Sequence, residues 1–208
     1  MIIYGINPVL EGLRAGRVKA LRVSARAGGR IDEILRLAKG HGVAVSRVEA
    51  RVLDEATAGA AHQGVVADLA VLPGYSVSDL ISSPRGKAPL VVVLDGVEDP
   101  QNLGAILRSV DAAGADGVVR QARRAAPLGA AAAKASAGAV AYVRIATVVN
   151  IARALEEMRE AGVWTVGLAA DAPVCYDRVD FTLPTAIVVG AEGTGLRRLV
   201  RERCEVLA

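Results

Sequence analysis

The sequence has few of the residues that metal sites, disulfide frameworks and membrane spans require. Its 208 residues include 2 Cys and 2 His, and their spacing matches no metal-ligand pattern. Aromatic residues make up only 3% of the chain. No apolar run reaches the roughly 18 residues that cross a bilayer, and no secretion leader is visible. We therefore expect a cytoplasmic protein that uses no metal and does not enter a membrane.

The chain is instead rich in aliphatic residues, and its charged content of 23% is ordinary. Hydrophobic residues make up 52%, which is enough for the core of a helix-and-sheet protein. Residues 1–72 hold 10 Lys and Arg against 7 Asp and Glu, whereas residues 73–208 hold 15 of each. The net charge of +3 therefore comes from the first third, which favours that segment as a contact surface for nucleic acid. A solvated surface with slightly more Arg than Glu explains the same count.

The hydrophobic pattern indicates two domains. Residues 1–70 alternate short strands (21–23, 43–45 and 64–69) with helices (31–38 and 53–58), which predicts a small α/β domain. Residues 71–88 are rich in Pro, Gly and Ser and are interpreted as a linker.

Residues 89–208 carry the signature of a parallel sheet. Leu90–Leu94 and Thr185–Val189 are continuous apolar runs, typical of strands buried on both faces. A further strand at 117–119, a strand-helix-strand unit over 142–168, and helices near 102–113 and 128–138 complete an α/β fold with helices on both faces. Ligands bind beyond the carboxyl ends of such strands, so the segments after Leu94, Leu168 and Val189 are the candidate site.

The segment after the first buried strand includes Asp99-Pro100-Gln101-Asn102, Gly104 and Arg108. Six helical residues turn through about 240° net, so a straight helix does not put Asn102 and Arg108 on one face. If both face one site, Asn102 belongs to the loop or cap and Arg108 to the helix. The alternative is that Asn102 is only an N-cap and Arg108 a solvated charge.

The segment after the last buried strand is Gly190-Ala191-Glu192-Gly193-Thr194-Gly195-Leu196. A glycine-rich turn between strand and helix is typical of a site where a nucleotide-like ligand lies against the backbone. The glycine spacing differs from the dinucleotide fingerprint, and no Lys-Ser/Thr pair follows to make a P-loop. This argues against an NAD-dependent oxidoreductase, which is the competing enzyme class.

Together the two segments resemble the SpoU family of RNA ribose 2′-O-methyltransferases, also called the TrmH family. The resemblance covers nearly the whole chain and extends to residues 4–9, 62–67, 123–128 and 134–139. It implies an N-terminal domain that binds structured RNA and a C-terminal α/β methyltransferase domain of the knotted SPOUT type. It further implies S-adenosylmethionine as the cofactor, a homodimer, and a guanosine of large-subunit ribosomal RNA as the target, with transfer RNA as the alternative substrate.

The resemblance also assigns roles to single residues. It makes Arg108 the catalytic residue, assisted by Asn102 and Glu192. Since arginine stays protonated in proteins, we interpret Arg108 as a clamp on the phosphate beside the target ribose rather than as a base. The cofactor-binding residues are then Gly190, Gly193, Gly195, Leu196 and Leu168.

Arg120, Arg123 and Arg124 are expected to form a basic loop that contacts RNA phosphates, with a solvated loop as the alternative. The family's third motif would follow residue 208. Without that motif we expect weak cofactor binding and an incomplete knot, and a non-catalytic RNA-binding protein becomes the alternative function.

Overall fold

The computed structural model describes residues 1–25, 29–70 and 74–208. Their contacts define two compact units. Unit 1 comprises Met1–Leu72, Pro100–Arg108 and Pro127–Tyr142, and unit 2 comprises Pro73–Asp99, Ser109–Ala126 and Val143–Ala208. Each unit contains one sheet. Within the described ranges, no helix has the length and apolar character needed to span a membrane.

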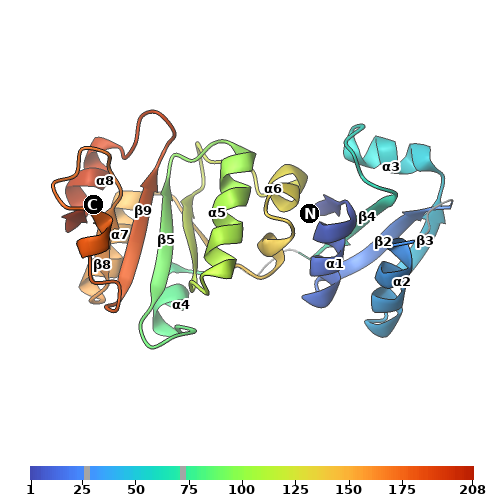
Figure 1. Cartoon of the computed structure of the whole chain (residues 1–208), viewed down its shortest axis with the longest axis horizontal. Helices are drawn as coiled ribbons and strands as arrows, with labels where there is room; N and C mark the ends of the chain where they lie inside the picture. The colour runs from blue at the N-terminus through green and yellow to red at the C-terminus, as the bar shows by residue number, and fades with distance from the viewer. Residues whose placement is uncertain (26–28, 71–73) are drawn as a thin grey trace. The chain divides into compact units, whose positions relative to one another are not determined.

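Unit 1 is built on a four-stranded sheet in the order β1-β4-β2-β3 (Figure 1). The strands are β1 (Ile2–Tyr4), β2 (Val18–Ser24), β3 (Ala44–Val48) and β4 (Val65–Leu69). β4 pairs antiparallel with β1 and β2, whereas β2 and β3 are parallel. The predicted strands at 21–23, 43–45 and 64–69 are confirmed, and β1 is an additional strand.

The helices of unit 1 are α1 (Ile6–Arg14), α2 (Ile31–Gly40), α3 (Ala50–Thr57) and α6 (Ala130–Ala135), followed by a short 3-10 turn at Ala139–Ala141. α2 follows its predicted pattern, since Ile31, Ile34 and Ala38 are buried and Asp32 and Glu33 occupy the first turn, where the helix dipole favours acids.

Gly104 marks a close approach between two helices of unit 1. It lies in α5 (Pro100–Ala112). A Cβ atom at this position would lie 2.3 Å from the Cβ of Ala135 and 2.8 Å from the backbone nitrogen of Ser136. The missing side chain of Gly104 therefore permits a close approach of α5 to the backbone at the end of α6.

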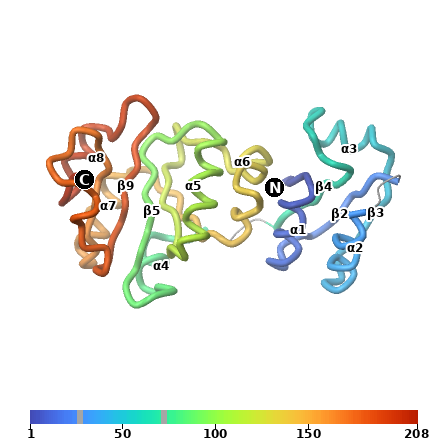
Figure 2. The backbone as a smooth tube through the Cα atoms, in the orientation of Figure 1, coloured from blue at the N-terminus to red at the C-terminus, as the bar shows by residue number. Residues whose placement is uncertain are grey.

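Unit 2 is built on a six-stranded parallel sheet in the order β10-β8-β9-β5-β6-β7. The two middle strands of this sheet, β9 and β5, run side by side (Figure 2). The strands are β5 (Leu90–Asp95), β6 (Gly117–Gln121), β7 (Ile145–Val148), β8 (Trp164–Gly167), β9 (Thr185–Gly190) and β10 (Val206–Leu207). One core contains side chains of α4 (Val77–Ser82), α7 (Ile151–Glu160) and α8 (Arg198–Arg203) together with Val93, Val119 and Val188 of the central strands. The prediction of a parallel α/β sheet is confirmed.

The segment interpreted as a linker contains ordered structure. Ser76 and Asp79 form a capping box that starts α4, and Leu80 is fully buried. The buried carboxylate of Asp116 accepts hydrogen bonds from the backbone N–H groups of Arg85 and Leu90. Much of 74–88 is therefore part of unit 2, while residues 71–73 of the predicted linker lie outside the described residues.

Gly104→Ala tests the close approach in unit 1. The added methyl group would overlap Ala135, so we expect a loss of about 1–3 kcal/mol in the free energy of unfolding, although alanine favours helix by about 1 kcal/mol. Gly40→Ala, at the end of α2, is the matched control because nothing lies within 4 Å of its Cβ position. Urea denaturation measures both changes, and equal effects of the two variants would contradict the interpretation.

Candidate active site

The candidate site in unit 2 lies where the order of the parallel strands reverses. From β5 the chain proceeds outward through β6 and β7, and it then returns to β8 and β9 on the other side of β5. β5 and β9 are paired from Leu90 and Thr185 to Asp95 and Gly190. The loops that follow these two strands therefore start side by side at the carboxyl edge, the usual ligand position in such sheets.

The loop after β9 is a tight turn. The backbone N–H of Ala191 donates to the Gly195 carbonyl at 3.1 Å, and the N–H of Gly195 donates to the Ala191 carbonyl at 2.8 Å. A Cβ atom on Gly190 would lie 2.2 Å from the Gly195 carbonyl carbon. Gly193 and Gly195 have φ values of +79° and +67° and face open space. Gly190 is thus required by the turn itself, while Gly193 and Gly195 leave backbone accessible to a ligand.

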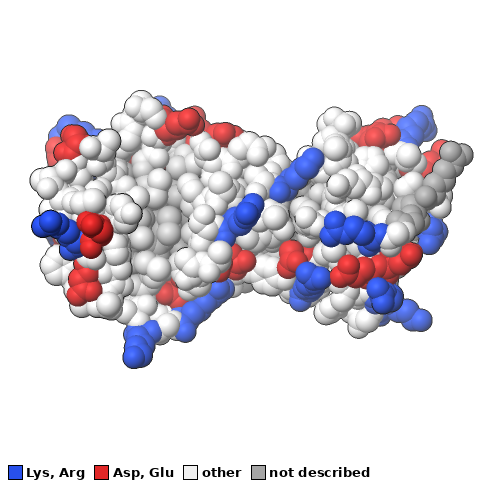
Figure 3. Space-filling model, viewed as in Figure 1, with Lys and Arg blue, Asp and Glu red and all other residues white. Residues whose placement is uncertain are grey.

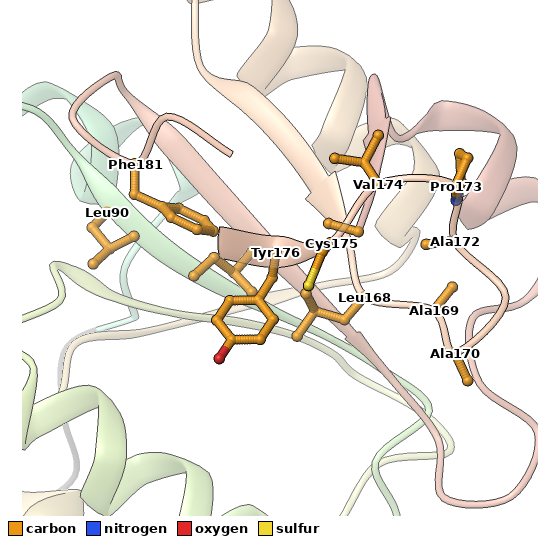
Figure 4. Close-up of a pocket in the computed structure, with 12 residues that line it drawn as sticks. Leu90, Leu168, Ala169, Ala170, Ala172, Pro173, Val174, Cys175, Tyr176 and Phe181 are labelled. Carbon is orange, nitrogen blue, oxygen red and sulfur yellow. The ribbon is translucent and has the colours of Figure 1, made fainter. Parts of the chain in front are cut away.

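Leu196 and Leu168 connect this turn to the end of β8. The Cβ position of Gly167 lies 2.8 Å from Cδ1 of Leu196, so the turn packs directly against the last residue of β8. Leu168, the next residue, lines an open apolar pocket of about 990 Å³. Its side chain lies beside those of Cys175 and Tyr176, and Leu90 and Phe181 line the other end of the same pocket (Figure 4). The glycines of the turn are not among the residues that line this pocket.

A polar chain that the sequence analysis missed joins three loops at this edge. The Asp95 carboxylate is fully buried and accepts hydrogen bonds from the backbone N–H of Arg197 at 2.8 Å and from its Nε at 2.7 Å. The Arg197 guanidinium also donates to Oε1 of Gln121 at 2.6 Å. Gln121 is 4% exposed, and its Nε2 donates to the Arg124 carbonyl at 2.6 Å. The acid at the end of a buried strand was the available sequence signal.

The predicted basic loop is only partly correct. Arg120 lies in strand β6 and is 7% exposed, so its assignment to an exposed loop is wrong. Burial lowers the pKa of its guanidinium, whose Nε atom has no hydrogen-bond partner in the described part of the chain. Arg123 and Arg124 follow β6 and are exposed, as expected of loop residues.

The residues of the first motif occupy helix α5. Asn102 is partly buried in the first turn of the helix rather than in the preceding loop or cap, so the condition under which Asn102 and Arg108 would face one site is not met. Arg108 is exposed two turns further along. Both residues belong to unit 1, whereas Glu192 is an exposed residue of the glycine turn in unit 2.

Comparison with known proteins identifies the family. Residues 89–208 match the family model described as the SpoU rRNA Methylase family, and residues 2–73 match the one described as RNA 2′-O ribose methyltransferase substrate binding. The chain belongs to the SpoU methylase family. The resemblance inferred from residues 99–108 and 190–196 is thereby confirmed.

Similar proteins cover the chain along almost its whole length. It is 39% identical over 212 residues to a protein of Pseudomonas aeruginosa named 23S rRNA (guanosine-2′-O-)-methyltransferase RlmB, and the match spans 99% of this chain and 85% of that protein. The RlmB protein of Pseudomonas syringae is 40% identical over 211 residues, which span 99% of this chain and 84% of that protein.

Among solved structures, an AdoMet-bound rRNA methyltransferase of Sinorhizobium meliloti matches with a TM-score of 0.79 and 26% identity over 100% of this chain and 76% of that one. AviRb of Streptomyces viridochromogenes matches in fold, with a TM-score of 0.82 and 24% identity over 100% and 79% of the two chains.

The two cysteines of this SpoU protein should differ in reactivity. Burial raises the pKa of the Cys204 thiol to about 11, and its Sγ lies 3.3 Å from the Val200 carbonyl, whereas Cys175 is exposed. The thiolate is the reactive form, so at pH 8 the fraction of Cys204 thiolate is roughly one hundredfold below that of a thiol with the reference value of 9.0. We expect iodoacetamide to label Cys175 alone in the native protein. Rapid labelling of a Cys175→Ser variant at this pH would contradict the expectation.

Proposed function

We propose that this protein transfers a methyl group from S-adenosylmethionine to a ribose 2′-hydroxyl of RNA, at a guanosine of large-subunit ribosomal RNA. The observation that carries the proposal is the match of 99% of the chain, at about 40% identity, to proteins named for that reaction. We further propose residues 1–70 as the RNA-binding domain and 89–208 as the methyltransferase domain. The connecting segment 71–88 includes α4, which belongs to unit 2. A homodimer in the cytoplasm, where ribosomal RNA is modified in bacteria, is part of this proposal.

The residues at the carboxyl edge of unit 2 fit S-adenosylmethionine. Gly193 and Gly195 leave open space beside the backbone, which suits the polar edge of an adenine or ribose. Leu196, at the end of the glycine turn, and Leu168, at the end of β8, supply apolar side chains near this open space. The cofactor would provide an activated methyl group on a sulfonium. The protein must hold the 2′-oxygen of the ribose in line with the methyl carbon and the sulfur.

In this proposal Arg108 binds the phosphate beside the target ribose and orients its 2′-hydroxyl. It is exposed, and a guanidinium binds phosphate oxygens in pairs while remaining charged. Asn102, in the first turn of α5, and Glu192, in the glycine turn, are proposed to assist in the roles that the family resemblance assigns to them. Asn102 lies six residues before Arg108, so the two side chains do not share one face of the helix.

Arg108→Ala tests the catalytic assignment. We expect methyl transfer to 23S ribosomal RNA transcript to fall at least about 100-fold, while calorimetric titration with S-adenosylmethionine gives an unchanged Kd. Arg159→Ala, which removes an exposed arginine from α7, is the matched control and should leave transfer unchanged.

Near-normal turnover of the Arg108 variant would refute its role. Transfer to tRNA transcript but not to 23S transcript would correct the substrate, and RNA binding with no transfer by the unaltered protein would favour a non-catalytic RNA-binding function.

The exposed arginines after β6 are proposed to contact RNA. Phosphate contacts make binding depend on salt, with a slope that falls by about one for each contact removed. We expect the double variant Arg123→Ala/Arg124→Ala to bind RNA more weakly and to lower the slope of log Kd against log salt by about two. The double variant Arg153→Ala/Arg159→Ala on α7 is the control, because it removes the same number of positive charges. Equal slopes for the two double variants would show that the loop is merely solvated.

A further inference from the structure

The loop that carries Arg123 and Arg124 is fixed at both ends by backbone hydrogen bonds. The N–H of Ala122 donates to the Val148 carbonyl at 2.8 Å, and the N–H of Ala126 donates to the Val97 carbonyl at 2.8 Å. Between these anchors Arg124 has a φ of +52°. This left-handed conformation is unfavourable for a residue with a side chain and persists only where the surroundings hold it.

The side chain of Gln121 supplies a contact that holds this conformation. Its Nε2 donates to the Arg124 carbonyl, while its Oε1 accepts from the Arg197 guanidinium, both at 2.6 Å. The two partners fix the orientation of the amide, because a guanidinium can only donate and a carbonyl can only accept. Gln121 therefore connects the middle of the arginine loop to the residue that follows the glycine turn.

Arg197 is in turn held by the fully buried Asp95 carboxylate through its backbone N–H and its Nε. A ligand that fills the open space beside Gly193 and Gly195 restrains the segment leading directly into Arg197. Through Gln121, that restraint reaches the backbone of Arg124. The chain of contacts thus runs from the proposed cofactor turn to the proposed RNA loop within unit 2.

We propose that Gln121 is a positioning residue that couples cofactor binding at the 190–196 turn to RNA binding by the 122–126 loop. The inference rests on the proposed function, since it takes the ligands of the two loops from there. Because coupling between two binding sites is reciprocal, the cofactor tightens RNA binding by the same factor by which RNA tightens cofactor binding.

Two variants of Gln121 distinguish its hydrogen bond to the Arg124 carbonyl from its hydrogen bond with Arg197. Gln121→Leu removes both hydrogen bonds. Gln121→Glu keeps an acceptor for Arg197 but has no donor for the Arg124 carbonyl. Arg198→Gln is the matched control, since it removes an adjacent exposed ion pair with Glu202 and leaves the polar chain intact. Circular dichroism verifies that each variant is folded.

The test measures the Kd for 23S ribosomal RNA transcript with and without saturating S-adenosylhomocysteine, the unreactive product of the cofactor. For the unaltered protein and for Arg198→Gln we expect the ligand to tighten RNA binding by about fivefold or more. For both Gln121 variants we expect the ratio of the RNA Kd without S-adenosylhomocysteine to the RNA Kd with it to be near one. Gln121→Glu should bind S-adenosylhomocysteine alone within about threefold of the unaltered protein, a result that a general loss of structure would not give.

A Gln121→Glu variant that keeps the full ratio would overturn the proposal. An unaltered protein that binds both ligands and transfers methyl groups with a ratio of one would overturn the coupling alone and leave the proposed function in place. An unaltered protein that binds neither ligand would overturn the proposed function together with this inference.

Discussion

The carboxyl edge of the larger sheet depends on one ion pair, that of Asp95 with Arg197. A carboxylate with no exposed surface is costly unless charge and hydrogen bonds compensate for its lost water. Arg197 provides this compensation with a backbone N–H and a side-chain Nε on the two oxygens. The bonds fix the loop after β9 to the end of β5, two segments 102 residues apart in the chain. The position of the glycine turn follows from this attachment, and the same guanidinium donates to Oε1 of Gln121 at the end of β6.

The central strands could be predicted from the sequence because burial on both faces leaves a continuous apolar run. Leu90–Leu94 and Thr185–Val189 needed no tertiary information for this reason. Helix α1 was missed because it contains Pro8 and Gly12, which ordinarily argue against a helix. Pro8 falls in the first turn, where no N–H donor is needed. At Gly12 a Cβ would lie 3.0 Å from side-chain carbons of Ile3 and Leu69, so its small size serves the packing of the helix on its sheet.

The candidate site could be predicted only where its functional residues are close together in the sequence. The glycine turn and the Asn102–Arg108 segment are contiguous, so their residue types and spacing carried a recognisable pattern. In the polar chain, Asp95 ends β5, Gln121 ends β6 and Arg197 follows the glycine turn. Only the fold reveals that these three residues meet. The error at Arg120 has the same origin. A charged residue ordinarily indicates exposed structure, but this one occupies a buried position in β6.

The shape and the position of the glycine turn are therefore set by different means. Its shape comes from the bonds between Ala191 and Gly195 and from the missing side chain at Gly190, all of which are local to residues 190–195. Its position comes from Arg197, whose backbone N–H, Nε and terminal nitrogen reach Asp95 and Gln121 in different directions. A lysine at 197 would keep the charge but could not donate from two separate nitrogens of a planar group. Geometry, and not charge alone, therefore requires arginine at the point where the two loops are joined.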